Sequence, residues 1–413
     1  MTSPFFEFGV PAGLVAALER YDIAAPFPVQ SAAIPPALAG QDIAARAPTG
    51  SGKTLAFGLP LIARVRQAEP RKPRALILTP TRELADQIAR ELKPYAKVVK
   101  RRVLAVYGGT SIPAQRRALN DGVDVLVACP GRLQDLVDQR IVDLSATDIV
   151  VVDEADRMSD MGFLPAVRRL LDQTASSRQV MLFSATLDGD VATLIREYQH
   201  APVEVSIDHD DGRISPADHV FHTVERPGRA EMLTRILDDA GRTIVFCRTR
   251  HGADRLARQL ARGGVRAVAI HGGHAQPRRT RSLAEFTSGR VHVLVATDVA
   301  ARGIHVDGIE QVVHFDPADD AKTYLHRSGR TARAGASGRV VSFIASDQVD
   351  DVAKLRRELG LTSNTNGRPV RSRASRKRQG VAAAASSRRT ISNGRARDRR
   401  QRTSSERKAG GHG

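Results

Sequence analysis

The sequence predicts two tandem α/β domains, each a mostly parallel sheet flanked by helices, followed by a disordered basic tail. Three observations predict this architecture. A chain of 413 residues is too long for one ordinary core. Short β-branched runs alternate with longer amphipathic stretches, which is typical of βαβ units. Finally, the runs repeat: "ALILT" at 75–79 and "TIVFC" at 243–247 lie 168 residues apart, as do two copies of "VLVA".

Ten apolar runs are expected to form the strands of the two sheets. Their near-continuous apolar composition suits strands that helices cover on both faces. The runs lie at 75–79, 102–107, 124–129, 149–153, 180–185, 243–247, 266–271, 292–297, 311–316 and 339–344. Between them lie helical patterns such as "ELADQIARELKPY", in which Leu84, Ile88 and Leu92 recur every four residues.

Composition shifts along the chain predict where the domains begin and end. Asp, Gly, Ser and Pro break both periodicities at 206–218, which predicts a linker between domains at 1–205 and 219–361. From 362 to 413 the aliphatic periodicity gives way to Arg, Ser, Gly and Ala, and this composition predicts disorder.

Charge and composition also bear on the class of protein. Hydrophobic residues make up 41% of the chain, no run is typical of a membrane span, and no secretory signal is evident, so we expect a cytoplasmic protein. Cys129 and Cys247 stand in apolar contexts and are expected to be buried rather than bonded to each other or to zinc. The formal net charge is +18, of which +13 lies beyond residue 363, and this imbalance predicts a polyanionic partner.

The stretch "APTGSGKT" has the context of a phosphate-binding loop, because it follows the strand-like "DIAARA" and precedes an apolar helical run. Gly50 and Gly52 allow backbone N–H groups to converge on phosphate oxygens at the start of a helix. Lys53 is expected to reach the β and γ phosphates, and the Thr54 hydroxyl to ligate Mg²⁺. A glycine-rich turn with a chance lysine is the alternative. The loop comprises Ala47, Pro48, Thr49, Gly50, Ser51, Gly52, Lys53 and Thr54.

Two carboxylates end the buried run "IVVVD" and supply the second half of a nucleotide site. Asp153 is expected to hold Mg²⁺, partly through water, and Glu154 to position and deprotonate the attacking water. The alternative is a solvated acidic helix start, which Asp and Glu favour in any case.

Together, A-x-T-G-S-G-K-T and D-E-A-D resemble the DEAD-box RNA helicase family, in which alanine is common at the first loop position. The similarity covers about residues 5–350, and "DEADRMSDMGF" and "RTRHGADRLA" are most similar to the bacterial RhlE-type subgroup. The resemblance implies two RecA-like domains, ATP and Mg²⁺ as cofactors, RNA as partner and a monomeric enzyme. ATP binding and hydrolysis would close and reopen the cleft between the domains and locally unwind RNA.

Further motifs in the family's order extend the resemblance to individual residues. In the first domain, "PTRELA", "YGG" and "CPGR" resemble contacts to the RNA backbone, and in the second "QPRR" and "ATDVAARG" do. "HRSGRTARAG" resembles the arginine-finger motif, which would aim Arg330 and Arg333 at the γ-phosphate. The RNA-binding residues implied are Arg82, Gly109, Arg132, Gln276, Arg279 and Thr297. Those that would couple the two ligands are Ser184, Thr186, Asp156, His326 and Arg327, and those that would hold the nucleotide from the second domain are Asp298 and Gly303.

An adenine-reading element is implied upstream by Phe5, Ile23, Pro26 and Gln30, where the glutamine amide can both donate to and accept from adenine. Ile23 stands where the family usually has an aromatic residue. His305 stands where it usually has the aspartate that holds the nucleotide's ribose, so ATP-driven closure is expected to be weaker or pH-sensitive.

Two readings other than an RNA helicase stay open at this point. A nucleotide-regulated RNA clamp would close without useful unwinding, and the departure at His305 favours it. A DNA helicase is disfavoured by D-E-A-D and Gln30. In either RNA-binding protein the tail, which lacks aromatic residues, is expected to add electrostatic, sequence-independent binding.

Overall fold

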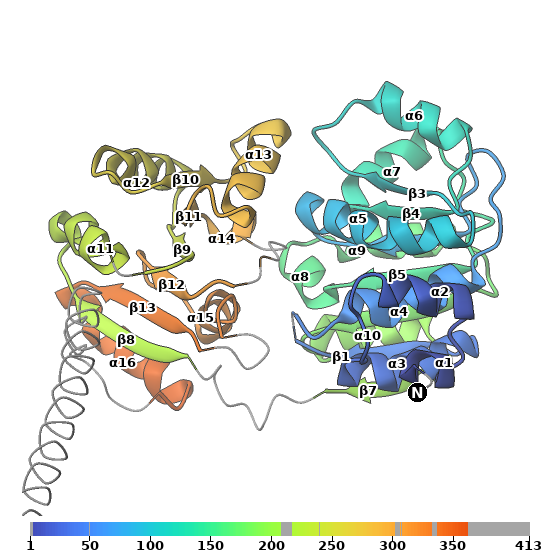
Figure 1. Cartoon of the computed structure of the whole chain (residues 1–413), viewed down its shortest axis with the longest axis horizontal. Helices are drawn as coiled ribbons and strands as arrows, with labels where there is room; N and C mark the ends of the chain where they lie inside the picture. Colours follow the sequence, from blue (N-terminus) through green and yellow to red (C-terminus); the bar gives the residue numbers. More distant parts are fainter. Residues whose placement is uncertain are drawn as a thin grey trace, which may run out of the picture.

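The computed structural model describes residues 3–48, 50–207, 217–238, 240–301, 306, 308–332 and 337–361. Thr49, Gly303, His305 and Arg333, most of the predicted linker and the whole predicted tail lie outside these residues. Two α/β domains lie side by side in Figure 1, with the N-terminal domain on the right.

The first domain contains a seven-stranded parallel sheet in the order β3-β4-β2-β5-β6-β1-β7. Its strands are β1 (Ile43–Arg46), β2 (Ala75–Leu78), β3 (Val103–Val106), β4 (Val125–Ala128), β5 (Ile149–Asp153), β6 (Gln179–Ser184) and β7 (Val203–Ser206). Parallel strands need a crossover connection, and helices provide it between nearly all consecutive strands of this domain. All five strands predicted for this domain are present, and β7 was missed.

The second domain contains a six-stranded parallel sheet in the order β10-β11-β9-β12-β13-β8. Its strands are β8 (Asp218–Thr223), β9 (Thr243–Phe246), β10 (Ala267–Ile270), β11 (Val293–Ala296), β12 (Gln311–His314) and β13 (Arg339–Ile344). The five predicted strands are again present, whereas β8 was missed and begins at the last residue of the predicted linker.

The two sheets repeat one topology, as the spacing of their sequences predicts. β2 and β9 begin 168 residues apart, as do β4 and β11, and each pair occupies the same place in its sheet. Matching β1 with β8 and β3 with β10 completes the correspondence, which leaves β7 as an additional edge strand of the first sheet. The predicted tandem α/β fold is therefore confirmed.

Helices cover both faces of each sheet, because strand side chains alternate between the faces and nearly all of them are apolar. In β2, Ile77 packs with helices α1 to α5, and Leu76 packs on the opposite face with α6 to α10. The helices of the first domain are α1 (Pro4–Glu7), α2 (Ala12–Glu19), α3 (Pro28–Leu38), α4 (Lys53–Arg64), α5 (Arg82–Val98), α6 (Ile112–Asn120), α7 (Pro130–Asp138), α8 (Ala155–Asp160), α9 (Leu164–Leu171) and α10 (Gly189–Tyr198). Leu84, Ile88 and Leu92 are buried along α5, as their spacing predicts.

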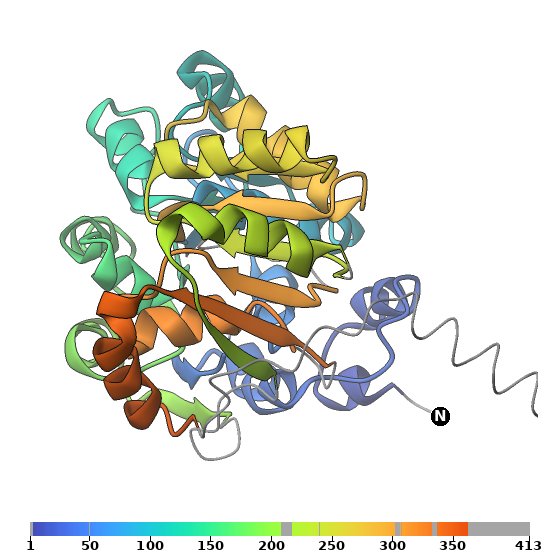
Figure 2. The same ribbon diagram turned by 90° about the vertical axis from the view of Figure 1, so that its left-hand side faces the viewer.

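The second domain has the same layered arrangement. Figure 2 shows α11 and α12 lying across one face of its sheet, and α13, α15 and α16 pack on the other. Its helices are α11 (Arg229–Leu237), α12 (Arg250–Arg262), α13 (Gln276–Thr287), α14 (Asp298–Ala301), α15 (Ala321–Ser328) and α16 (Val349–Glu358). Within the described ranges, none of the helices has both the length and the apolar character needed to cross a bilayer.

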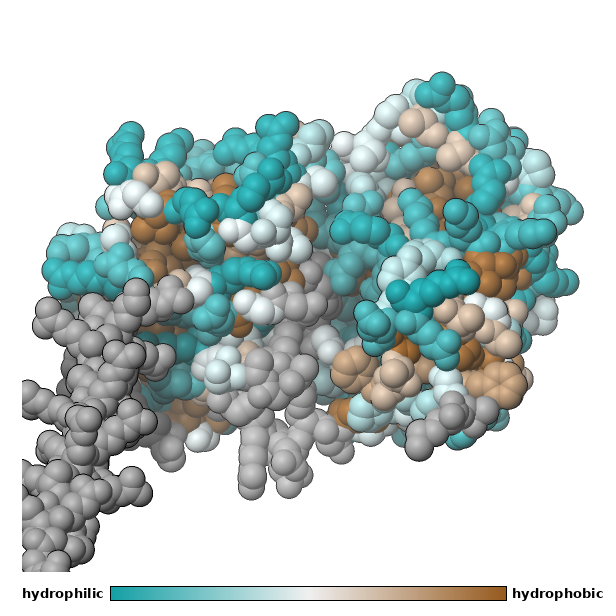
Figure 3. All heavy atoms as spheres, in the orientation of Figure 1, coloured by the Kyte–Doolittle hydropathy of each residue, from teal (hydrophilic) through white to brown (hydrophobic). Residues whose placement is uncertain are grey.

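Helix α12 shows how the charge of this domain is distributed. Leu256 and Leu260 are buried against the sheet, while Arg255, Arg258 and Arg262 lie on its exposed side. The surface over this helix, at the upper left of Figure 3, is strongly hydrophilic. These three arginines of α12 thus lie outside the core, where water solvates them.

Candidate functional site

The stretch predicted to bind phosphate connects β1 directly to α4. Ala47 continues the pairing of β1 with β6, because its backbone N–H donates to the Ser184 carbonyl at 2.9 Å, and its side chain is fully buried. Lys53 is the first residue of α4 and is itself buried, with Nζ donating to the Ala47 carbonyl at 3.1 Å. The lysine therefore folds back over the loop. The free N–H groups that begin a helix of this length favour an anion at the same point.

Gln30 joins the predicted adenine-reading element to this loop. Its side-chain Nε2 donates to the Gly52 carbonyl at 3.0 Å, and its Oε1 accepts from the Phe27 backbone N–H at 2.9 Å. Gly52 has a φ of +89°, and a Cβ atom there would lie only 2.6 Å from Gln30 Nε2 and 2.8 Å from the Phe27 ring. Only glycine fits between these two side chains in this conformation.

Replacing Gly52 with alanine is expected to lower the free energy of unfolding by about 1–3 kcal/mol, because the new Cβ meets both a left-handed backbone and two neighbours. Displacing Gln30 should also weaken ATP binding. Chemical denaturation and titration with a fluorescent ATP analogue would measure the two effects. Gly228→Ala is the matched control, since its Cβ would meet nothing closer than 3.5 Å. Equal stability and ATP affinity in the two variants would contradict this account.

Phe27 is a residue that the sequence interpretation missed. Its side chain is 47% exposed although it lies against Gly52, so an aromatic face is open at the edge of the loop. Aromatic rings stack readily on planar ligands. The signal in the sequence is the aromatic residue between two prolines in "APFPVQ", immediately before Gln30.

The other predicted adenine contacts lie differently. Phe5 is fully buried in the first core, where its ring meets that of Phe8 edge-on at 6.3 Å. Ile23 is half-buried and packs against the same core. Pro26 is also half-buried, directly before Phe27. Of this element, Gln30 is the residue that touches the phosphate loop.

The two predicted catalytic carboxylates end β5. Asp153 and Glu154 are both buried, and burial raises the pKa of the Asp153 carboxyl to about 7, against the lowering effect of the nearby Lys53 charge. Glu154 adopts a left-handed conformation with φ 55° and ψ 49°, which is uncommon outside glycine. Its carboxylate pairs with Arg157 at 2.8 Å. The strand end thus holds one carboxylate near Lys53 and fixes the other with an arginine.

Ser184 connects these carboxylates to the end of β6. Its hydroxyl accepts a hydrogen bond from the Asp156 backbone N–H at 3.1 Å, and it is fully buried. Thr186 follows two residues later and is half-buried. This hydrogen bond links the end of β6 to the D-E-A-D segment, so a movement of one would displace the other. A coupling role requires such a link.

Helix α15 of the second domain faces α8 of the first. Lys322 Nζ contacts Asp160 Oδ1 at 2.7 Å, which fixes one point of the interface. Burial and the positive charge of Arg157 lower the pKa of His326 to about 4, while Asp156 opposes that shift, so the imidazole faces the D-E-A-D segment. Arg330 follows α15 and is buried in the same region. Two domains therefore contribute to one site.

Asp298 and Arg327 form a pair within the second domain. The arginine's Nε and Nη2 contact the two oxygens of Asp298 at 2.6 and 2.7 Å, and its Nη1 donates to the Asp316 carbonyl at 2.7 Å. The guanidinium also lies 5.2 Å from the centre of the Phe246 ring. The Asp298 carboxylate, predicted to hold the nucleotide, is thus committed here to fixing Arg327 near Arg330, with which both residues line one small cavity.

A second contact between the domains joins α5 to α13. Arg279 Nη2 contacts Glu83 Oε2 at 2.7 Å, and Gln276 Nε2 donates to Glu83 Oε1 at 3.2 Å. Gln276 also accepts from Arg82 Nη1 at 3.4 Å. Gln276 and Arg279, predicted to bind RNA, are buried on the first domain in this conformation, and Glu83 is the partner that sequence reasoning did not foresee.

The remaining predicted RNA contacts lie around this interface. Gly109 has a φ of +84°, and a Cβ there would lie 2.4 Å from Arg82 Nη1. Arg132 Nη1 donates to Gln115 Oε1 at 3.0 Å. Thr297 is buried at the end of β11, and its carbonyl accepts the first hydrogen bonds of α14. Arg82 begins α5, Gly109 lies in the turn after β3 and Arg132 lies in the first turn of α7, so all three follow strands at the carboxyl edge of the first sheet.

A phosphate-binding loop on a parallel sheet, two carboxylates on a neighbouring strand and an arginine from a second domain define a two-domain nucleotide-binding protein. The sequence comparisons narrow this class. The model of the DEAD/DEAH box helicase family matches residues 27–194, and that of the helicase conserved C-terminal domain matches residues 228–335. The chain belongs to the DEAD-box helicases of this family.

Named relatives agree with this assignment. The chain is 37% identical over 346 residues to the DEAD-box ATP-dependent RNA helicase CshA of Bacillus subtilis. This match covers 83% of this chain and 70% of that protein. It is 37% identical over 368 residues to the mitochondrial DEAD-box ATP-dependent RNA helicase 9 of Arabidopsis thaliana, covering 87% of this chain. It spans 60% of that relative's length and 48% of a chloroplast relative from maize.

A solved structure supports the same fold. Saccharomyces cerevisiae Dbp5 bound to RNA and ADP BeF3 matches with a TM-score of 0.77 and 26% sequence identity. The match covers 88% of this chain and 95% of that chain. It extends over both domains, so the RecA-like character of the two sheets is established.

Proposed function

We propose that this protein is an RNA-dependent ATPase that uses ATP hydrolysis to unwind short RNA duplexes or to remodel RNA–protein complexes. One observation carries the proposal. Helix α15, which leads to the buried Arg330, lies against α8, the helix that follows Glu154, with Lys322 Nζ on Asp160 Oδ1 at 2.7 Å. If ATP hydrolysis needs residues of both domains, then RNA that binds across the two domains can control the rate of hydrolysis by bringing them together.

The residues of the first domain fit ATP and Mg²⁺. Lys53 would hold the β and γ phosphates, and Gln30 with Phe27 would meet the adenine. The buried Asp153 carboxylate and the Thr54 hydroxyl are oxygen donors of the kind that Mg²⁺ prefers. When bound, Mg²⁺ would supply positive charge that offsets the negative charge developing on the phosphates. Glu154 would accept the proton of the water that attacks the γ-phosphorus. Arg330 would stabilise the negative charge that develops as the bond between the γ-phosphorus and the ADP oxygen breaks.

RNA would lie along the carboxyl edge of the first sheet, where Arg82 begins α5, Gly109 lies in a turn and Arg132 lies in the first turn of α7. An arginine and a loop glycine suit phosphate and ribose contacts, which carry no base sequence. Gln276 and Arg279 would act by holding the domains together through Glu83, which is their contact in this structure. A strand bound on both domains is bent when they close, and a bent strand no longer pairs regularly with its complement.

Rates of ATP hydrolysis and strand separation, measured with duplex RNA, with a DNA of matched sequence and without nucleic acid, test the proposal. Turnover that requires RNA, together with RNA unwinding, is the expected result. RNA binding with negligible turnover would instead establish a nucleotide-regulated clamp, and equal activity on DNA would establish a DNA helicase.

The finer assignments belong to the same proposal. "DEADRMSDMGF" and "RTRHGADRLA" support the RhlE-type subgroup, and the family resemblance supports a protein that acts as a monomer, for which we propose a cytoplasmic location. Domains at 1–205 and 219–361 around a linker at 206–218 are supported by the break in periodicity. Sedimentation at increasing concentration tests the monomer, and limited proteolysis tests the boundaries.

Removing residues 362–413 is expected to weaken RNA binding at low salt and to leave the basal ATPase rate unchanged. The segment from Asn364 carries 15 Lys and Arg residues and only two acidic ones. If about ten of these charges contact single-stranded phosphates, they contribute about −7 to the slope of log affinity against log salt concentration. Truncation should remove that contribution. Fluorescence anisotropy over a salt series measures this. A tail of scrambled sequence is the control and should bind normally; unchanged affinity without any tail would refute the prediction.

A further inference from the structure

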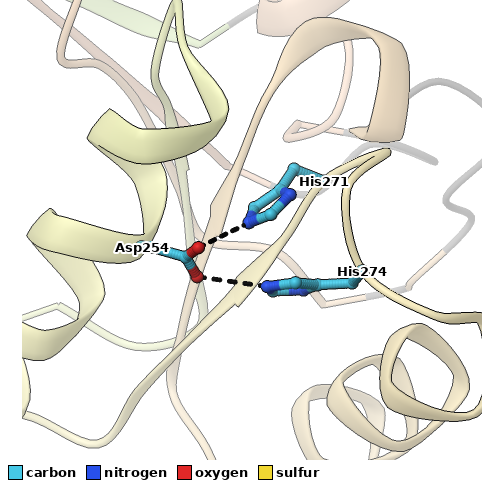
Figure 4. A group of neighbouring side chains, drawn as sticks. All are labelled: Asp254, His271 and His274. Atoms are coloured by element: carbon cyan, nitrogen blue, oxygen red, sulfur yellow. Dashed lines mark hydrogen bonds and ion pairs between the residues drawn. The ribbon is translucent and has the colours of Figure 1, made fainter.

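Two histidines and an aspartate meet beyond the carboxyl end of β10, where the chain turns toward α13. His271 is the first residue after β10, His274 lies three residues later, and Asp254 reaches them from α12 (Figure 4). His271 Nε2 lies 2.9 Å from one Asp254 oxygen, and His274 Nε2 lies 3.1 Å from the other. Both imidazoles therefore converge on a single carboxylate.

We propose that Asp254, His271 and His274 bind a divalent first-row transition ion such as Zn²⁺. Zn²⁺ and other divalent first-row transition ions bind imidazole and carboxylate ligands, whereas Mg²⁺ prefers oxygen ligands alone. Nothing in the ATP or RNA site described above uses these side chains. The proposal concerns a separate site and does not depend on the helicase function.

The distances suit such an ion. Metal–ligand bonds of about 2.1 Å at tetrahedral angles place ligand atoms roughly 3.4 Å apart. The three ligand atoms here lie within 4.8 Å of one another, and the two histidine–carboxylate distances are already slightly shorter than that spacing. An ion could enter through small movements, and the remaining coordination position would be left for water.

The surroundings of the cluster allow an ion to enter. The side chains of His271 and His274 are 5% and 4% exposed, which pre-positions them, whereas Asp254 is 26% exposed and opens the cluster to solvent. Arg278 Nη2 lies 3.6 Å from Asp254, but its side chain is 62% exposed and can turn into water when an ion takes its place. His274 Nδ1 has no hydrogen-bond partner within the described structure, so that ring is oriented by Asp254 and by the His271 ring, whose centre lies 3.7 Å from its own.

Binding has a structural consequence that can be observed. The Gly273 backbone N–H donates to His271 Nδ1 at 3.2 Å, so this ring carries its proton on Nε2. With an ion on Nε2 that proton must move to Nδ1, and the Gly273 bond must break. The affected turn leads directly into Gln276, which contacts Glu83 of the first domain.

Titration of the untagged, chelator-treated full chain with Co²⁺ tests the proposal through the visible absorption of the bound ion. We expect one equivalent to bind, Zn²⁺ to displace it, and amide exchange at Gly273 to become faster. His274→Asn and Asp254→Asn should each weaken binding at least about tenfold, because each removes a ligand. His251→Asn, on the exposed side of the same helix, is the control and should bind normally.

Two results would overturn the proposal. One is the absence of saturable one-equivalent binding by the natural chain, in which case the cluster is a hydrogen-bonded clasp only. The other is equal affinity in the natural chain and in His274→Asn, which would place the ion elsewhere. Circular dichroism shows whether each variant is folded, and if Asp254→Asn is not, the natural chain and His274→Asn decide the matter without it.

Discussion

Replacing Glu154 with glutamine is expected to lower the rate of ATP hydrolysis by about 10²–10⁴-fold while ATP still binds, because a general base typically contributes this much. The residue follows β5 in a left-handed conformation, is buried, and is held by Arg157 at 2.8 Å. Glutamine keeps the shape and can still accept from Arg157, but it cannot take a proton. Single-turnover hydrolysis and binding of a fluorescent ATP analogue separate the two effects.

The exposed Glu204 on the edge strand β7 provides the matched control, since Glu204→Gln makes the same chemical change on the surface and should hydrolyse ATP normally. A Glu154→Gln rate within about twofold of the natural chain would exclude the role of base. Loss of nucleotide affinity in parallel with the rate would show that the residue serves binding or folding instead. Thermal melting distinguishes those two outcomes.

Replacing Arg330 with alanine is expected to lower the RNA-stimulated rate by about 10³–10⁵-fold, which is the usual worth of an arginine finger. The residue is buried where α15 ends, close to the bidentate Asp298–Arg327 pair. Its guanidinium acts only when the domains are together, so the slow rate without RNA should change much less. Lysine at this position should restore little, because it lacks the planar fork of arginine.

Turnover number with saturating RNA and ATP measures this effect, and RNA affinity should stay unchanged. Arg255→Ala removes an arginine from the exposed side of α12 and serves as the control. If Arg330→Ala reduced the rates with and without RNA by the same factor, the residue would not depend on domain closure, and the proposed gating would be wrong.

The sheets could be predicted because their signal is local. The apolar runs predict ten of the 13 strands of the described residues to within two residues, and the repeat at 168 residues correctly indicates two copies of one topology. "DIAARA" was recognised as strand-like before the phosphate loop and is β1. The two strands that were missed, β7 and β8, have few apolar residues: "VEVS" and "DHVFHT" alternate with polar side chains at sheet edges, so no apolar run marks them.

Contacts across long stretches of sequence could not be predicted in the same way. Glu83 and Arg279 are 196 positions apart, and only the placement of α5 against α13 makes them partners. The pairing of Asp298 with Arg327 also depends on the fold, because α14 and α15 are separate helices that the sheet brings together. Motif spacing therefore identifies which residues are candidates for binding and catalysis. Ion pairs such as Glu83–Arg279 decide which of those side chains are free to contact a ligand, and these pairs depend on the fold.

The two sheets share one order over six strands, but they differ in the turn that follows the first strand of each. In the first copy the turn after β1 is the glycine-rich loop that carries Lys53; in the second, the equivalent turn after β8 leads through "VERPG" into α11 and has no such loop. The second domain thus repeats the scaffold of the first without its phosphate-binding loop. It contributes Arg330 and contacts across the interface instead, so the two domains have different roles and one cannot replace the other.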